Sequence, residues 1–189
     1  TPSYELAVTT RTIDLTLQDG IRVKVGDVTR RYLGTVRTTA VAGQTEDSAV
    51  KRYLFNEQNR VRRSLQRQET TATWTYTTAT IRQANGNTAN QVEYVVGSGD
   101  GWISILLRAL SANSTGGVLT EVGIGKDSTT VFPTDSPHIR RIEPTAGVVL
   151  ELQAWIQQMP PVGYHYYPWL EYSEATGTTT WYGSGGGLN

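Results

Sequence analysis

The scarcest chemically useful residues are the histidines, of which the chain has two, His138 and His165. A histidine can act as a general base or as a metal ligand when the fold brings suitable partners to it. Neither histidine belongs to a pair with the sequence spacing of metal ligands. We therefore favour an interpretation in which His138 lies in a loop and His165 lies in a sheet, without a catalytic role.

Carboxylates are scattered along the chain rather than grouped. Two of them on facing strands could flank a glycosidic bond, as the two carboxyl groups of a glycoside hydrolase do. The spacing selects no such pair, and any β-sandwich of this size brings several carboxylates opposite one another. We predict no catalytic residue and no enzymatic activity, and we keep a glycan depolymerase as an alternative. The carboxylates considered are Glu46, Asp47, Glu93, Asp127, Glu151, Glu171 and Glu174.

No motif predicts a cofactor or a bound metal. The chain has no cysteine, which excludes a thiolate metal site, a cysteine nucleophile and a disulfide framework. Residues 123–128, Gly-Ile-Gly-Lys-Asp-Ser, superficially resemble a phosphate-binding loop. Their glycine spacing differs from that of the nucleotide motif, and the context is the end of a strand rather than a strand-to-helix turn. We interpret this segment as a turn.

The strongest charge feature is an arginine cluster that follows Lys51 and Arg52. Such a cluster can bind nucleic acid or a phosphate-bearing glycan, contact acidic groups on a second subunit, or form a solvated face. The chain has 17 basic and 17 acidic residues, whereas nucleic-acid-binding domains usually carry a net basic surface. We favour a solvated face or a subunit contact, and we predict no nucleic-acid partner. The cluster consists of Arg60, Arg62, Arg63 and Arg67.

A run of aromatic residues near the C-terminus could form a platform on which sugar rings stack, or a contact with another partner. Side chains alternate between the two faces of a strand. Tyr164 and Tyr166 are therefore expected on one face and Tyr167 and Trp169 on the other, unless Pro168 introduces a bulge. One of the two sets is expected to belong to the core. The candidate glycan or partner contacts are Tyr164, Tyr166, Tyr167 and Trp169.

Alternating apolar residues and turn signals predict strands along most of the chain. Residues 8–25 read as a hairpin whose turn contains Asp19-Gly20, a pair that accepts positive φ readily. We expect residues 72–81 to pair with 90–96, and residues 102–112 to form a central strand because they are too apolar for a solvated edge. The other expected strands are 31–38, 50–56, 118–124, 146–156, 164–172 and 178–182, with a helix over 50–56 as an alternative and a long loop over 125–142.

These strands predict an all-β fold, an antiparallel β-sandwich of jelly-roll type with about ten strands, preceded by a short β-hairpin. We expect a lead-in and hairpin over 1–29, the sandwich domain over 30–183, and a flexible glycine-rich tail over 184–189. No apolar run approaches the roughly 18–20 residues of a membrane span, so no membrane insertion is predicted. The start, Thr1-Pro2, lacks an initiator methionine and a signal-peptide pattern, which indicates a processed chain or a fragment.

Several long motifs carry a resemblance to known proteins. They lie at residues 17–24, 31–39, 43–48, 51–61, 73–76, 82–91 and 169–173. These motifs resemble a family of tailed-bacteriophage and prophage virion structural proteins. The resemblance covers most of residues 15–182, and its motifs are chemically bland. One departure is the segment 56–62, Asn-Glu-Gln-Asn-Arg-Val-Arg, where we associate a tyrosine-rich, proline-containing segment with the family.

The resemblance implies a component that is exposed on the phage particle. Such a component is a tail or head fibre, a spike or a decoration protein. The resemblance carries over no site residue. It implies a homotrimer, since phage fibres and spikes are usually trimers, and other virion proteins as partners. Our hypothesis is a structural domain that contacts the host surface during host attachment, with a host cell-surface glycan as a candidate partner. The alternatives are a capsid surface-decoration protein that stabilises the shell and a glycan depolymerase.

Overall fold

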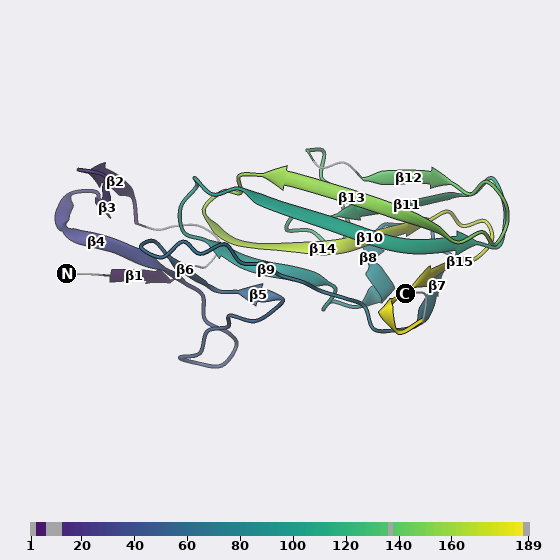
Figure 1. The fold of residues 1–189 in the computed structure, drawn as a ribbon, viewed down its shortest axis with the longest axis horizontal. Helices are drawn as coiled ribbons and strands as arrows, with labels where there is room; N and C mark the ends of the chain where they lie inside the picture. Colours follow the sequence, from purple (N-terminus) through teal and green to yellow (C-terminus); the bar gives the residue numbers. More distant parts are fainter. Residues whose placement is uncertain (1–2, 7–12, 136–137, 187–189) are drawn as a thin grey trace. The chain divides into compact units, whose positions relative to one another are not determined.

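The computed structural model describes residues 3–6, 13–135 and 138–186, shown as a ribbon in Figure 1. The chain divides into two compact units. The hairpin unit consists of Thr1–Gln66, Val92–Trp102 and Met159–His165, and the sandwich unit consists of Arg67–Gln91, Ile103–Gln158 and Tyr166–Asn189. Each unit is therefore assembled from segments that are far apart in the sequence.

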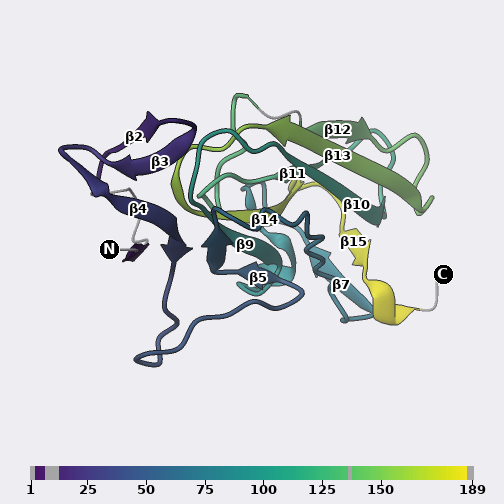
Figure 2. The same ribbon diagram turned by 60° about the vertical axis from the view of Figure 1, so that its left-hand side comes forward.

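The hairpin unit begins with the predicted hairpin, which the structure confirms. Strands β2 (Leu15–Gln18) and β3 (Ile21–Lys24) pair antiparallel, as Figure 2 shows. Asp19 and Gly20 have φ angles of 51° and 79°, the positive values that a two-residue hairpin turn with right-handed strand twist requires. The local turn chemistry therefore fixes this element.

The long strand β4 (Asp27–Val36) holds the sheet of the hairpin unit together. It pairs antiparallel with β3 and with β6 (Leu54–Asn56), and parallel with β1 (Ser3–Leu6). Strand β5 (Lys51–Arg52) pairs parallel with β9 (Gln91–Val96), which places Lys51 opposite Glu93. Residues 50–56 thus contain two short strands, and the alternative of a helix there is wrong.

The first sheet of the sandwich unit has the order β13 (Leu150–Gln158), β10 (Ile103–Asn113), β15 (Thr179–Tyr182) and β7 (Thr73–Tyr76). Strand β10 lies beside β13 in Figure 1, and their register runs from Ile103 opposite Gln158 to Ser111 opposite Leu150. Because β15 pairs with the other edge of β10, the prediction of a central strand at 102–112 is confirmed.

The second sheet of the sandwich unit contains β12 (Ile139–Ile142), β11 (Leu119–Ile124) and β14 (Gly163–Ser173). Strand β11 pairs antiparallel with both of its neighbours. The short strand β8 (Arg82–Gln83) pairs with β14 at Glu171 and Leu170.

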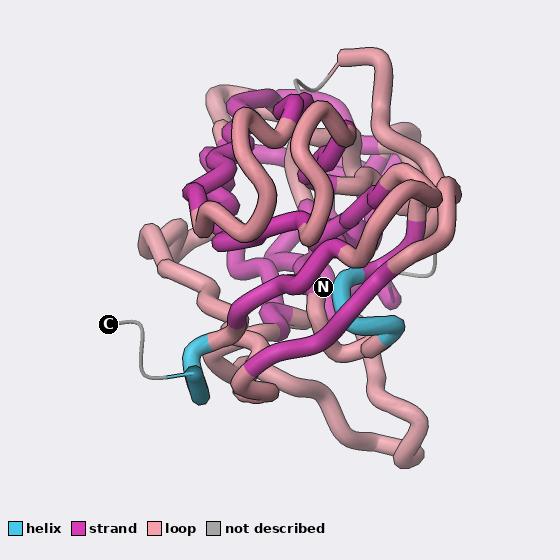
Figure 3. Tube along the Cα trace, turned by 90° about the vertical axis from the view of Figure 1, so that its right-hand side faces the viewer, coloured by secondary structure: helices cyan, strands magenta, loops and turns pink. Residues whose placement is uncertain are grey.

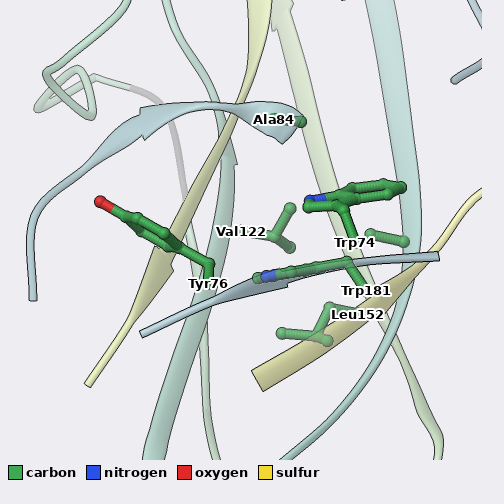
Figure 4. Close-up of a cluster of buried hydrophobic side chains, with 7 residues drawn as sticks. Trp74, Tyr76, Ala84, Val122, Leu152 and Trp181 are labelled. Carbon is green, nitrogen blue, oxygen red and sulfur yellow. The ribbon is translucent and has the colours of Figure 1, made fainter. Parts of the chain in front are cut away.

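The core of the sandwich unit draws side chains from both sheets (Figure 4). Trp181 and Leu152 from the first sheet and Val122 from the second are all at most 1% exposed. Trp74 packs edge to face on Trp169, with ring centroids 5.5 Å apart. Aromatic pairs of this geometry contribute about 0.5–1.5 kcal/mol beyond the area that they bury. Two sheets that share one core make this unit a β-sandwich.

The fold as a whole is nearly all-β, with 47% of residues in strands and 3% in helices, so the predicted fold class is confirmed. Figure 3 shows how little of the described chain is helical; the helical turns are η1 (Ala84–Gly86) and η2 (Ser184–Gly186). The described residues contain fifteen strands, where the sequence predicts about ten. The difference arises because several strands have only two to four residues. Residues 187–189 of the predicted tail lie outside the described residues.

Two predictions of pairing and length are wrong. Residues 72–81 do not form a hairpin with 90–96, because β7 pairs with β15 and sets Trp74 opposite Trp181. The turn signal at Asn85-Gly86 forms the 3-10 turn η1 instead, with Asn85 at φ 57°. The predicted loop 125–142 ends in strand β12, which alternation over four residues is too short to reveal.

Candidate functional site

The hairpin unit contains an open concavity of about 340 Å³. Its wall consists of the segment that follows β4, of Glu46, and of Lys51 in β5 with Tyr53 after the strand. Two cationic side chains and one carboxylate face it, together with threonine residues. The lining residues are Arg37, Thr38, Thr39, Ala40, Glu46, Lys51 and Tyr53.

Backbone hydrogen bonds close the loop that carries the first wall. The Arg37 amide donates to the Tyr53 carbonyl at 2.8 Å, and the Thr39 amide donates to the Gln44 carbonyl at 2.8 Å. The Thr45 hydroxyl donates to the Arg37 carbonyl at 2.7 Å. Gly43 turns the loop at φ 75°, a value that a residue with a side chain rarely adopts. The wall is therefore fixed before any ligand binds.

A second small hairpin carries the other wall. The Tyr53 amide donates to the Glu46 carbonyl at 2.8 Å, and the Ser48 amide donates to the Lys51 carbonyl at 2.7 Å. Both oxygens of the Glu46 carboxylate have partners: Ser48 Oγ donates to Oε1 at 2.8 Å, and Lys51 Nζ lies 3.4 Å from Oε2. This hairpin holds one cation and the carboxylate at neighbouring positions on the rim.

Two tyrosine rings hold the Arg37 guanidinium in place. Its Cζ atom lies 3.5 Å from the ring centroid of Tyr164 and 5.5 Å from that of Tyr53. The two rings meet edge to face, with centroids 6.0 Å apart and an interplanar angle of 78°. A cation over an aromatic face is attracted by the ring quadrupole, by about 0.5–2 kcal/mol according to its exposure.

The Glu93 carboxylate binds the hydroxyl groups of both tyrosines. Its side chain is buried, and its Oε2 atom accepts the Tyr164 hydroxyl at 2.7 Å and also the Tyr53 hydroxyl. Burial, together with the hydrogen bond to Glu93, raises the pKa of Tyr53 to about 12 and raises that of Tyr164 as well. Both phenols therefore keep their protons at neutral pH and remain donors to Glu93.

The arrangement offers both donors and acceptors to a polar ligand, with the charges of Arg37 and Lys51 balanced by Glu46 and Glu93. A guanidinium and an ammonium offer charge-assisted donors, and the threonine hydroxyls can donate or accept. The lining contains one carboxylate, so it lacks the two carboxyl groups of the usual glycosidase. Among the described residues, no group of three His, Asp or Glu side chains has the geometry of a metal site.

The structure separates the predicted aromatic contacts. Tyr164 belongs to the hairpin unit and supports Arg37. In the sandwich unit, Tyr167 is 3% exposed and its hydroxyl accepts Gln158 Nε2 at 2.7 Å, while Trp169 packs against the core. Tyr166 is half-buried, and its backbone amide donates to Asp127 Oδ1 at 3.0 Å. Tyr167 and Trp169 are thus largely core residues, which the alternation of the strand allowed.

The predicted arginine cluster is also divided. Arg60 pairs with Glu57 at 2.6 Å and with Asp100 at 2.7 Å, and the same two carboxylates bind Arg22. Arg60, Glu57, Arg22 and Asp100 thus form a ring of alternating positive and negative charges. The charge of Arg60 is balanced within the hairpin unit.

The other three arginines have different surroundings. Arg63 pairs with Asp47 at 2.9 Å, and Arg67, in the sandwich unit, donates to Asn90 Oδ1 at 3.1 Å. Arg62 is exposed and makes no ion pair in the part of the chain that the structure describes. Arg62 is therefore the member of the cluster most available to a second subunit.

The two histidines have structural surroundings. His165 is 6% exposed, and its Nε2 atom lies 2.9 Å from the Pro161 carbonyl. His138 stacks on Phe132 with centroids 4.6 Å apart, and it lies 3.4 Å from Glu121. His138 lies in the loop that directly precedes β12, and His165 lies in strand β14, so both predicted locations are confirmed.

Sequence reasoning missed the concavity, although it singled out Lys51, Glu46, Glu93 and Tyr164 for other reasons. The site needs four segments that are distant in the sequence, and no spacing predicts their meeting. The parallel pairing of β5 with β9 brings Lys51 and Glu93 together, and a two-residue strand gives no periodic signal.

Comparison with models of known protein families, with curated proteins and with solved structures gives no match for this chain. In the described residues, no helix has the length and apolar character needed to cross a membrane.

Proposed function

We propose that this chain is a non-enzymatic structural domain exposed on a tailed-bacteriophage particle, where it contacts the host surface. The resemblance of the motifs in residues 15–182 to phage virion proteins supports the location. The all-β fold is compatible with this location. A particle component that lacks cysteine must gain its stability from packing and association.

The observation that carries the binding role is the preformed concavity in the hairpin unit. Its two cations are fixed by Glu46, by the tyrosine pair and by Glu93, so little side-chain entropy is lost when a ligand binds. The proposed partners are host-surface molecules and other virion proteins. The domain acts by binding and not by turnover.

Two measurements test this proposal. Immunogold labelling of intact particles with an antibody to this chain is expected to decorate fibres or spikes. The purified protein is expected to block adsorption of the same phage in a dose-dependent way. Labelling of the head lattice without any block of adsorption would favour the decoration protein. Release of reducing ends from host polysaccharide would favour the depolymerase.

A further inference from the structure

We propose that the sandwich unit binds internal water molecules among the buried side chains of Arg141, Glu143 and Thr120. These residues lie where the edge strand β12 pairs with β11 (Figure 1). The waters hydrogen-bond to polar atoms of the three side chains, in a place where apolar packing would otherwise be expected. All three residues belong to the sandwich unit, so this site does not depend on the proposed phage role.

A buried ion pair forms one side of this site. Arg141 Nη2 lies 2.8 Å from Glu143 Oε2 and also donates to the carbonyl and the hydroxyl of Ser111, each at 3.1 Å. The Asn113 amide donates to the same Glu143 oxygen at 3.3 Å. Glu143 is 0% exposed, and the Arg141 side chain is 13% exposed. These bonds engage one nitrogen of the guanidinium and one oxygen of the carboxylate.

The remaining polar atoms of this pair need further partners. In the part of the chain that the structure describes, Arg141 Nε and Nη1, Glu143 Oε1 and Thr120 Oγ1 are buried and make no hydrogen bond to protein. Thr120 lies directly opposite Arg141 in the β11–β12 ladder, so their side chains are neighbours. Buried polar groups are almost always hydrogen-bonded, to protein or to ordered water, because an unpaired one opposes folding. Water is therefore expected at these atoms.

The chemistry of these atoms matches water better than an ion. The Arg141 N–H groups donate, Glu143 Oε1 accepts, and the Thr120 hydroxyl can do either. A water molecule can accept from the guanidinium and donate to the carboxylate, whereas an anion can only accept. The charges of Arg141 and Glu143 balance each other. A neutral molecule is therefore favoured over an ion.

The neighbouring charges do not change this balance. Glu121 follows Thr120 along β11, so its side chain points to the other face of the sheet. There its carboxylate pairs with Arg140 at 2.9 Å.

The hydrated ion pair links the two sheets of the sandwich. Strand β12 has four residues and, among the described strands, pairs with β11 alone. Of its inward-facing side chains, Ile139 packs against the apolar core cluster, whereas Arg141 reaches Ser111 on β10 of the facing sheet. Water at the remaining atoms of Arg141 and Glu143 lets this polar link replace apolar packing without leaving buried groups unpaired.

The direct test is a high-resolution crystal structure of the full chain, with a second data set from crystals soaked in bromide. An ordered water oxygen is expected within about 3.2 Å of both Glu143 Oε1 and an Arg141 nitrogen. Bromide at these atoms, located by its anomalous scattering, would show an anion site and overturn the inference. Direct bonds from these atoms to other side chains, or unpaired atoms in a dry contact, would also overturn it.

Magnetic relaxation dispersion of water oxygen-17 tests the same site in solution, because its amplitude reports long-lived internal waters. The double variant Arg141→Met with Glu143→Leu replaces the ion pair by apolar side chains of similar volume, a change that buried pairs often tolerate. Its amplitude is expected to fall by that of at least one water. An amplitude equal to that of the wild type would contradict the inference.

The matched control is the double variant Arg140→Met with Glu121→Leu, which removes an ion pair from the same two strands on the opposite face. Its dispersion amplitude is expected to match the wild type. A fall as large as that of the Arg141–Glu143 variant would show that the loss is not specific to the buried site and would count against the inference. An amide spectrum with wild-type dispersion confirms that each variant folds. If the Arg141–Glu143 variant does not fold, the wild-type crystal structure still decides the question.

Discussion

A single carboxylate oxygen of Glu93 accepts the hydroxyls of both Tyr53 and Tyr164. The two rings in turn hold Arg37 by cation–π contacts. Glu93 thus positions Arg37 indirectly, through the two tyrosines. Removing one hydroxyl should lower the free energy of unfolding by about 1 kcal/mol. Removing both should lower it by an amount that differs from the sum of the two single effects, because the hydroxyls share one acceptor.

Replacing Tyr53 by phenylalanine should change how stability depends on high pH. Burial and the bond to Glu93 raise the pKa of folded Tyr53 to about 12, against 10.0 for an ordinary tyrosine. The unfolded chain therefore loses this proton first, so the stabilisation is complete below pH 10 and is lost as pH rises towards 12. Urea unfolding over this range should show a smaller loss in Tyr53→Phe than in the wild type.

Arg31→Gln is the control for this measurement, since Arg31 is exposed on β4 and does not line the concavity. Its alkaline loss of stability should match the wild type. An equal loss in Tyr53→Phe and the wild type would show that the phenol of Tyr53 is not shielded.

Glu69 should control stability at low pH. Burial opposes its ionisation, but bonds from the Thr71 amide and from the side chains of Asn87 and Asn90 outweigh burial and lower the pKa of Glu69 to about 2. Since the ordinary value is 4.5, the stabilisation is present above pH 4.5 and disappears as pH falls towards 2.

Glu69→Gln is expected to lower stability by about 1–3 kcal/mol at neutral pH and to flatten the acid limb of the stability curve. Chemical denaturation at a series of pH values measures both effects, with exposed Asp14→Asn as the control. An acid limb as steep as that of the wild type would contradict the role assigned to Glu69.

At the scale of elements, Gly123 in β11 allows a close approach to the chain before β12. A Cβ atom there would lie 2.6 Å from Phe132 Cδ1 and 2.9 Å from His138 Cβ. Gly123→Ala should therefore disturb the stack of Phe132 on His138 and destabilise the protein by about 1–3 kcal/mol.

The matched control is Gly116→Ala, where the nearest atom would lie 3.6 Å from the new Cβ. Thermal unfolding of the two variants compares them directly. A melting temperature for Gly123→Ala equal to that of Gly116→Ala would show that the Phe132 side chain moves away without cost.

Sequence alone predicts the elements whose signals are local. The β2–β3 hairpin follows from Asp19-Gly20, and the central place of β10 follows from its largely apolar sequence, which only Ser104 and Arg108 interrupt before Ser111. The pairing of Trp74 with Trp181 could not be predicted, because the partner of a short strand is chosen by core packing and not by the nearest turn. The same holds for the site, where tertiary contacts of Tyr53 and Tyr164 link Arg37 to Glu93.

At the scale of the whole molecule, the balanced charge, 17 basic and 17 acidic residues, provides little net repulsion between copies of the chain. We expect a homotrimer, with a mass in size-exclusion light scattering three times the 20.8 kDa of the chain. Arg62→Glu should shift this mass towards the monomer if the exposed Arg62 contacts a second subunit, while Arg31→Glu should not. A wild-type monomer at micromolar concentration would refute the trimer.

The interleaving of the two units has a consequence for genetic dissection. The hairpin unit needs Val92–Trp102 and Met159–His165 in addition to Thr1–Gln66, and strands β9 and β14 each pass from one unit to the other along their length. A deletion from the start of the gene that passes Gln66, or one from its end that passes Tyr166, therefore removes parts of both units, and a stop codon after Gln66 also discards Glu93 and Tyr164. Deletion mapping would make every activity seem to require the whole chain, so point substitutions are needed to assign a phenotype to either unit.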